Sequence, residues 1–180
     1  LMTASLVMST YLRKKTKSLY YRRLLVVDEM AVEVLITREK LDVNEYLERL
    51  SRDSSRDGCG ALVIFMGFVK GLVNNELVSE LIYEAYESFA LSKMREIGED
   101  AVKEFGVRDV VVVHRVGNLR PGDPTIYIFV TAKERSKAFK AAEYVLERVK
   151  HEVPISKLEV RENGEFWVLG DGRRIRRAER

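Results

Sequence analysis

Strand patterns that occur in pairs between helical patterns constrain the fold of this chain most. One strand pattern, residues 31–36, precedes the first helical pattern, and pairs of strand patterns follow each helix. The resulting order is β-α-β-β-α-β-β-α-β-β. Because consecutive strands joined without a helix usually pair antiparallel, this order favours helices packed on a mostly antiparallel sheet. We therefore predict an α+β fold that ends in a β-hairpin.

Capping residues and apolar periodicity predict where the helices begin and end. Asp42 and Glu45 form a capping-box-like pattern at the start of the first helix. Gly106 follows the second helix, where a left-handed glycine commonly ends a helix. Residues 135–151 predict the third helix, whose buried stripe is largely alanine and valine.

Other stretches predict strands, loops and ends. The continuous apolar run at residues 61–66 predicts a strand buried on both faces, after a polar loop at residues 51–60. Asn163-Gly164 is typical of a hairpin turn. Residues 170–180 are basic, and we expect them to be frayed.

Composition limits the organisation and the class of protein. The 180 residues fit one domain, with a basic extension at residues 1–29 and the folded domain at residues 30–180. We expect the extension to be disordered or loosely docked, with an organellar presequence or a nucleic-acid-binding arm as alternatives. The single cysteine, Cys59, excludes an internal disulfide and fits a reducing cytoplasm. Two histidines make a metal site unexpected, and no apolar run is long enough to span a membrane.

Residues 148–159 are the most informative candidate site. A helix pattern ends at Pro154 and a strand pattern leaves it, so Lys150 and Lys157 bracket the break. A helix end and a strand start that meet at a proline place two ammonium groups near one point, which suits an anionic substrate. The alternative from this stretch alone is two solvated surface lysines.

Further basic residues lie where predicted strands and helices end. Lys70 lies in a loop with a glycine at each end, residues 67–71, and His114 and Arg115 end a β-branched strand. The alternative for this pair is a histidine bonded to the backbone and an arginine in a surface ion pair. Arg135 lies at the other end of the predicted helix from Lys150, more than about 20 Å away, so the two residues do not line one pocket of one subunit. Arg135 is therefore either structural or part of a pocket shared across a dimer. No Walker loop, dinucleotide fingerprint or nucleophile elbow is present.

Taken in order, the motifs resemble those of the large, catalytic subunit of molybdopterin synthase over roughly residues 31–169. The matching blocks are Gly60-Ala61 leading to Gly67-Phe68-Val69-Lys70, Tyr83-Glu84-Ala85-Tyr86, His114-Arg115-Val116-Gly117-Asn118-Leu119, Pro121-Gly122-Asp123, Arg135-Ser136-Lys137-Ala138-Phe139, Lys150 through Pro154 to Lys157-Leu158-Glu159, and Trp167-Val168. Each block is weakly specific, and the ordered set is strongly specific.

The resemblance implies an α/β hammerhead fold and a cytoplasmic sulfurtransferase of molybdenum cofactor biosynthesis. It implies a homodimer within a heterotetramer, with a small ubiquitin-like sulfur-carrier partner whose C-terminal Gly-Gly bears a thiocarboxylate. Sulfur would pass twice to cyclic pyranopterin monophosphate, and the product would be molybdopterin with its dithiolene. The resemblance implies no permanently bound cofactor, no metal, no membrane and no nucleic acid.

By the same resemblance, Lys150 is similar to the principal catalytic lysine and Lys157 to its neighbour. The resemblance implies that His114 and Arg115 bind the pterin or the phosphate. It adds further substrate-binding positions: Phe68, Val69, Lys70, Leu158 and Glu159. The chain departs from the family pattern at Lys70, where arginine is usual, at Ser156, where tryptophan is common, at Glu134, where histidine is usual, and at Asp171, where a distal arginine would fall.

These residue types suit the implied chemistry. A cyclic phosphate and a thiocarboxylate are both anions, so cations that neutralise their repulsion also stabilise an oxyanion formed as sulfur leaves the acyl carbon. Clustered cations lower the pKa of a lysine, which leaves acid–base, electrostatic and covalent roles open. One alternative is a small basic α+β nucleic-acid-binding module, although the sequence lacks the aromatic platform typical of such modules. The other is a non-catalytic scaffold with the same fold, which the presence of both lysines disfavours.

Overall fold

The computed structural model describes residues 31–178, which form two sheets and three helices. The first sheet has the strand order β1-β5-β7-β2, in which β1 and β5 are parallel and the other neighbours are antiparallel. Its strands are β1 (Ala31–Thr37), β2 (Ala61–Phe68), β5 (Asp109–Arg115) and β7 (Pro124–Ala132). The predicted extension at residues 1–29 lies outside the described residues.

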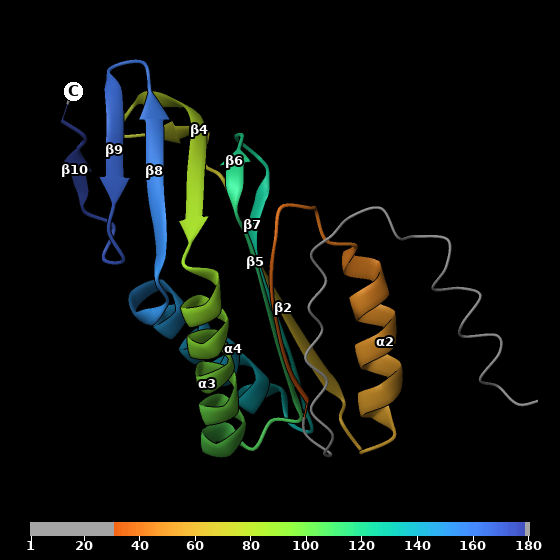
Figure 1. Cartoon of the computed structure of the whole chain (residues 1–180). Coiled ribbons are helices and arrows are strands. Elements are labelled where there is room, and N and C mark those ends of the chain that lie inside the picture. Colours follow the sequence, from red (N-terminus) through yellow and green to blue (C-terminus); the bar gives the residue numbers. More distant parts are fainter. Residues whose placement is uncertain (1–30, 179–180) are drawn as a thin grey trace, which may run out of the picture.

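Helices cover both faces of the first sheet. α3 (Glu87–Phe105) and α4 (Arg135–Glu152) pack against one face, and α2 (Val43–Ser55) lies against the other, as Figure 1 shows. The larger core lies between the sheet and the α3–α4 pair, and a smaller core lies under α2. Because β5 and β7 are central strands covered on both faces, every residue of these two strands is buried.

The second sheet continues from the ends of α3 and α4 (Figure 1). Its order is β10-β9-β8-β4-β3, and β6 also pairs with β4. β4 leads directly into the start of α3, and β8 begins just after the end of α4. The second sheet therefore meets the first one near the start of α3 and the end of α4. Its strands are β3 (Leu72–Val73), β4 (Glu76–Ala85), β6 (Gly117–Leu119), β8 (Ile155–Arg161), β9 (Gly164–Val168) and β10 (Arg174–Arg176).

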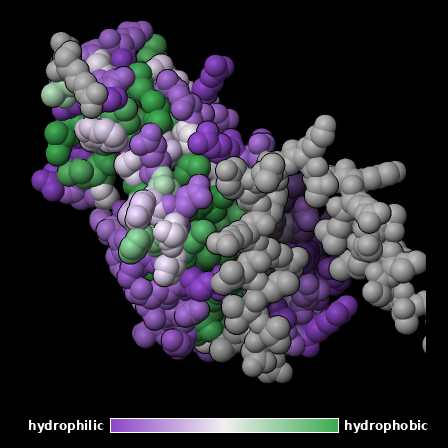
Figure 2. Space-filling view, viewed as in Figure 1, coloured by the Kyte–Doolittle hydropathy of each residue, from purple (hydrophilic) through white to green (hydrophobic). Residues whose placement is uncertain are grey.

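The space-filling view separates two kinds of surface. In Figure 2 apolar surface reaches solvent over the second sheet, whereas the outer surface of the helices is mostly hydrophilic. Leu72 and Leu77, a cross-strand pair of β3 and β4, are both more than half exposed. Among the described residues, no helix has the length and apolar character needed to cross a membrane.

The predicted fold class and caps are confirmed. The molecule is α+β, and only the β1–β5 neighbours of the first sheet are parallel. The Asp42 side chain accepts hydrogen bonds from the backbone N–H groups of Asn44 and Glu45, and Gly106 has the left-handed φ of 62°. The β8–β9 hairpin forms as predicted, although Gly164 is already paired with Arg161 and the two turn residues precede it.

Three local predictions are wrong. β2 is an edge strand, not one buried on both faces, because it pairs only with β7; Met66 and Phe68 are exposed. Part of the predicted loop at residues 51–60 is helical, since α2 continues to Ser55. The basic end is not frayed at residues 174–176, because these residues pair with β9.

Candidate active site

A cavity of about 630 Å³ opens where the two sheets meet the C-terminal end of α4. Its walls come from β2 and the loop after it, β4, β5, β7, α4, β8, and the stretch from the end of β9 to the start of β10. The polar side chains that line it include Lys70, Tyr83, His114, Thr125, Glu147, Lys150, His151, Lys157, Glu159 and Arg174. Basic side chains from four separate segments therefore face one space.

The two lysines reach the cavity from different secondary-structure elements. α4 ends at Glu152, just before Pro154, and β8 begins at Ile155, so the chain reverses between Lys150 and Lys157. Lys150 is exposed, and its Nζ lies 3.0 Å from an oxygen of Glu147. Lys157 is partly buried; burial lowers its pKa, and Arg174, Lys70 and Lys150 lower it further, while Glu159 opposes the shift.

His114 enters the cavity as a neutral ring. Burial lowers its pKa to about 4, although the backbone hydrogen bond opposes the shift. Its Nδ1 lies 2.8 Å from the carbonyl oxygen of Arg115. Because a carbonyl oxygen only accepts, Nδ1 carries the proton and Nε2 is left as an acceptor. The ring is therefore suited to receive an N–H or O–H group, and at neutral pH it adds no positive charge.

Arg115 lies on the other face of β5, because neighbouring residues of a strand point to opposite faces. Its guanidinium is buried and donates to the carbonyl oxygens of Pro124, at 2.9 Å, and Arg38, at 3.0 Å. It does not line the cavity. This arrangement ties the ends of β5, β7 and β1 together and is close to the structural alternative considered for the pair, with carbonyl groups in place of an ion-pair partner.

The other predicted positions divide in the same way. Phe68, Lys70 and Glu159 line the cavity together with the lysines and His114. Val69 and Leu158 are buried and do not line it. Arg135 is exposed at the opposite end of α4, so it is not brought to this cavity within one subunit. Their roles in catalysis or binding stay predictions.

A buried ion-pair cluster forms one wall, and it includes a residue that sequence reasoning did not assign. Glu159 accepts hydrogen bonds from Arg161 and, at 2.9 Å, from Arg174. Burial raises the pKa of Glu159, but these two guanidinium groups lower it overall. Arg174 comes from β10, within the segment predicted to be frayed, so only its pairing with β9 reveals its place at the cavity.

Close backbone packing places that segment. A Cβ added to Gly170 would lie 2.7 Å from the carbonyl oxygen of Lys150, so a side chain here would displace the segment after β9 from the end of α4. The same segment also borders a second hollow of about 720 Å³. The second hollow shares Lys150, His151 and Lys157 with the first, and its other walls include Tyr86, Pro154 and Trp167. The two hollows thus meet at the lysines.

Comparisons with known proteins identify the class. The family model described as MoaE protein matches residues 36–152. The molybdopterin synthase catalytic subunit of Pyrococcus abyssi is 38% identical over 133 residues, which are 74% of this chain and 87% of that protein. The crystal structure of molybdopterin synthase from Staphylococcus aureus matches with a TM-score of 0.65 and 30% identity, covering 79% of this chain and 98% of that one. The chain therefore belongs to the MoaE protein family.

The family is that of molybdopterin synthase catalytic subunits, which are enzymes of molybdenum cofactor biosynthesis. A Helicobacter pylori structure, described as a complex of subunits 1 and 2 of molybdopterin-converting factor, has the same fold, with a TM-score of 0.59 and 23% identity over 83% of this chain and 91% of that chain. Membership of this family displaces the nucleic-acid-binding alternative.

Proposed function

We propose that this chain transfers sulfur from the C-terminal thiocarboxylate of a small ubiquitin-like partner to cyclic pyranopterin monophosphate, forming the dithiolene of molybdopterin. The observation that carries the proposal is the convergence of Lys150, Lys157, Lys70 and Arg174 on one cavity. Two anionic reactants repel each other, and fixed cations between them offset that repulsion. The substrate and product are ligands of the cavity, and the proposal needs no resident cofactor or metal.

The charged and the neutral side chains of the cavity have different proposed binding roles. Lys70 and Arg174 supply charge for the cyclic phosphate. Neutral His114 offers Nε2 as an acceptor for a pterin N–H group, which a protonated histidine could not do. Lys150 lies at the junction of the two hollows, so it can face both the pterin and the arriving acyl carbon. We assign Lys150 to stabilising the charge on the acyl oxygen as sulfur leaves.

The assembly is part of the proposal. Transfer between a protein tail and a small molecule needs two approaches to one point, and the two hollows that share the lysines supply them. The exposed apolar side chains of the second sheet are suited to contacts with other chains. We propose a homodimer of this chain with one small partner per subunit, in the cytoplasm. Arg135 would serve a cavity only across such a dimer.

The test is reconstitution with a small ubiquitin-like protein that ends in Gly-Gly, prepared as the thiocarboxylate. We expect dithiolene formation from cyclic pyranopterin monophosphate, and none when the carrier ends in an ordinary carboxylate. We expect Lys157→Ala to be impaired but less completely than Lys150→Ala. A carrier that binds without transferring sulfur would refute the reaction while leaving the assembly intact.

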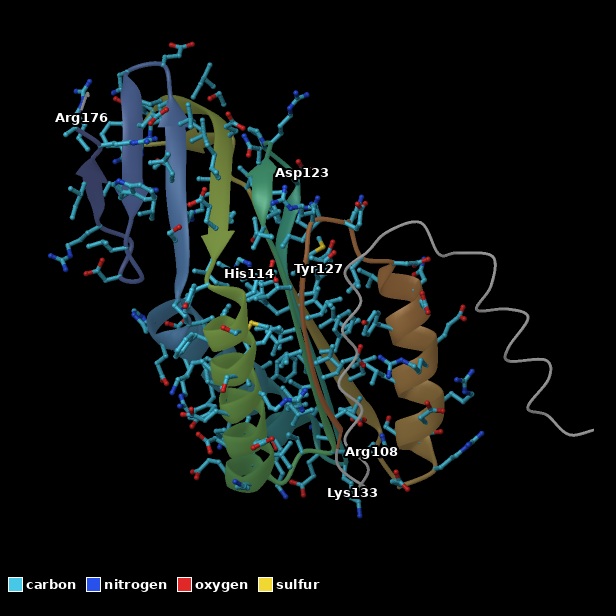
Figure 3. The ribbon with its side chains drawn as sticks, viewed as in Figure 1. Arg108, His114, Asp123, Tyr127, Lys133 and Arg176 are labelled. Carbon is cyan, nitrogen blue, oxygen red and sulfur yellow. The ribbon has the colours of Figure 1, made fainter. Side chains whose placement is uncertain are left out.

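Cys59 separates this mechanism from one in which the chain itself carries sulfur. It lies next to Arg108 and Lys133, at the end of the first sheet away from His114, as Figure 3 shows for the three labelled residues. β2 separates the two ends, and its eight residues span about 26 Å. Burial raises the pKa of the Cys59 thiol, despite the opposing charge of Arg108, so the thiolate needed for a persulfide is disfavoured.

We therefore expect Cys59→Ser to keep nearly full activity with the thiocarboxylated partner. The measurement is dithiolene formation by the variant and the unaltered chain at equal partner concentrations, with circular dichroism as the check of folding. A folded but inactive variant, together with labelled sulfur on Cys59, would replace the partner-borne route with a persulfide carrier.

A further inference from the structure

Tyr83 occupies the junction between the two sheets. It belongs to β4, is 8% exposed and lines the cavity. Its Cα pairs with Lys157 of β8 on one side and with Gly117 of β6 on the other. Lys157 is on the second sheet and His114 is on the first. Tyr83 lies between these two side chains, at the junction that sets the distance between them.

The side chain of Tyr83 contacts one residue of each strand that meets there. Its ring is edge-to-face with the His114 ring, with centroids 5.2 Å apart and an interplanar angle of 67°. The Nζ of Lys157 lies 5.8 Å from the centre of the same ring. The Thr125 side chain of β7 acts to lower the pKa of the Tyr83 hydroxyl, which places Thr125 beside that hydroxyl. One rigid side chain therefore lies beside β5, β7 and β8.

We propose that Tyr83 is a positioning residue for the sulfur-transfer reaction: its ring fixes the Lys157 ammonium and the His114 imidazole relative to each other across the sheet junction. The inference rests on the proposed function, because Lys157 and His114 are assigned to substrate there. It adds a residue to which no role in the reaction was assigned from the sequence motifs.

Lys157 depends on the ring because its other neighbours do not hold it. Within residues 31–178 its ammonium has no hydrogen-bond or ion-pair partner, and it lies over the Tyr83 ring, 5.8 Å from the ring centre. The charges of Lys70, Lys150 and Arg174 repel it, and the nearby carboxylate of Glu159 is already bonded to two arginines. An aromatic face that attracts a cation without accepting a proton suits such a position.

Tyr83 itself is not suited to move a proton. Burial raises its pKa to about 12; the Thr125 side chain opposes this shift and the Glu159 charge adds to it. The hydroxyl therefore stays protonated at neutral pH, and the role left to the residue is geometric. This distinction predicts that the ring is required and that the hydroxyl is not.

The experiment compares Tyr83→Phe, which keeps the ring, with Tyr83→Leu and Tyr83→Met, which remove it. We expect Tyr83→Phe to retain kcat close to that of the unaltered chain. We expect the ring-free variants to lose about 100-fold in kcat, the scale of a 1 Å misplacement of a reacting group. Two ring-free variants of different shape ensure that a folded one is assayed.

A second readout does not require turnover. The reactivity of the Lys157 amine towards a small acylating reagent, followed by mass spectrometry across pH, reports its pKa in the chain alone. Removing the ring takes away its attraction for the ammonium and alters the burial that lowers the pKa of Lys157, so this pKa should shift in the ring-free variants and stay unchanged in Tyr83→Phe. If neither the unaltered chain nor any variant transferred sulfur, the proposed function would be wrong. The Lys157 reactivity would still test whether Tyr83 positions Lys157.

Tyr144 is the matched control. Its ring is edge-to-face with Phe105 at 5.3 Å and 67°, and the Arg148 guanidinium lies 5.3 Å from its centre, but it does not line the cavity. Tyr144→Leu should lower stability without moving the Lys157 pKa or kcat. Folded ring-free Tyr83 variants with unaltered kcat and an unaltered Lys157 profile would overturn the proposal, as would a Tyr83→Phe variant as inactive as they are.

Discussion

Replacing Lys150 with alanine is expected to reduce dithiolene formation by about 100- to 1000-fold, down to background. The reason is that Lys150 lies where the two hollows meet and its ammonium group is exposed to both, whereas Lys157, which also borders both hollows, is partly buried. The fold should be unaffected, because the side chain is about half exposed and its pair with Glu147 is a surface ion pair. The measurement is single-turnover product formation with saturating thiocarboxylated partner.

The matched control for this loss is Lys93→Ala. Lys93 also pairs with a glutamate three residues along its helix, Glu96 at 2.7 Å, but it does not line the cavity. We expect full activity and an unchanged melting temperature for that variant. Turnover by Lys150→Ala at the rate of the control would contradict the mechanism proposed for this site.

Glu159→Ala is expected to lower the free energy of unfolding by about 3–5 kcal/mol, the range for removing one partner of a buried ion pair. Glu159 is 2% exposed and binds two guanidinium groups, so alanine would leave Arg161 buried beside Arg174, with only the more exposed carboxylate of Glu76 as an ion-pair partner of Arg161. Activity should fall as well, because Arg174 would lose the contact that holds it at the cavity. Urea unfolding followed by circular dichroism measures the first effect.

The control is Glu165→Ala on the neighbouring strand. Glu165 and Arg177 form a pair at 2.8 Å in which both side chains are more than 40% exposed, so the loss should be below about 1 kcal/mol. Equal losses for the two variants would show that burial does not set the strength of the Glu159 cluster.

The Glu159 contribution also has a defined pH dependence. The folded-state pKa lies below the unfolded value of about 4.3, so the stabilisation is complete above that value and is lost as pH falls through the folded-state pKa. The stability difference between the unaltered chain and Glu159→Gln should therefore be constant above about pH 5.3, where an unfolded glutamate is ionised, and shrink in acid. A difference that grew in acid would reverse the assigned sign.

Some features of the site could be predicted because their causes are local. Asp42 and Gly106 act through groups within a few residues, so their caps follow from residue type. Pro154 ends α4 for the same kind of reason, which places Lys150 and Lys157 on either side of a helix–strand reversal. Their common cavity is a consequence of that reversal, so the sequence predicted both lysines.

The sequence by itself determined the α+β class, the caps of the helices and the pair of lysines, because these depend on periodicity and on neighbours along the chain. Only the tertiary structure decided that His114 faces the cavity and Arg115 does not, since a strand alternates its faces and the packed layers decide which face is which. It alone placed Arg174 and Tyr83 at the site, through pairing of β10 with β9 and of β4 with β6 and β8. Such pairings join residues far apart in the chain, and the free energy that selects them comes from burial of the whole layer.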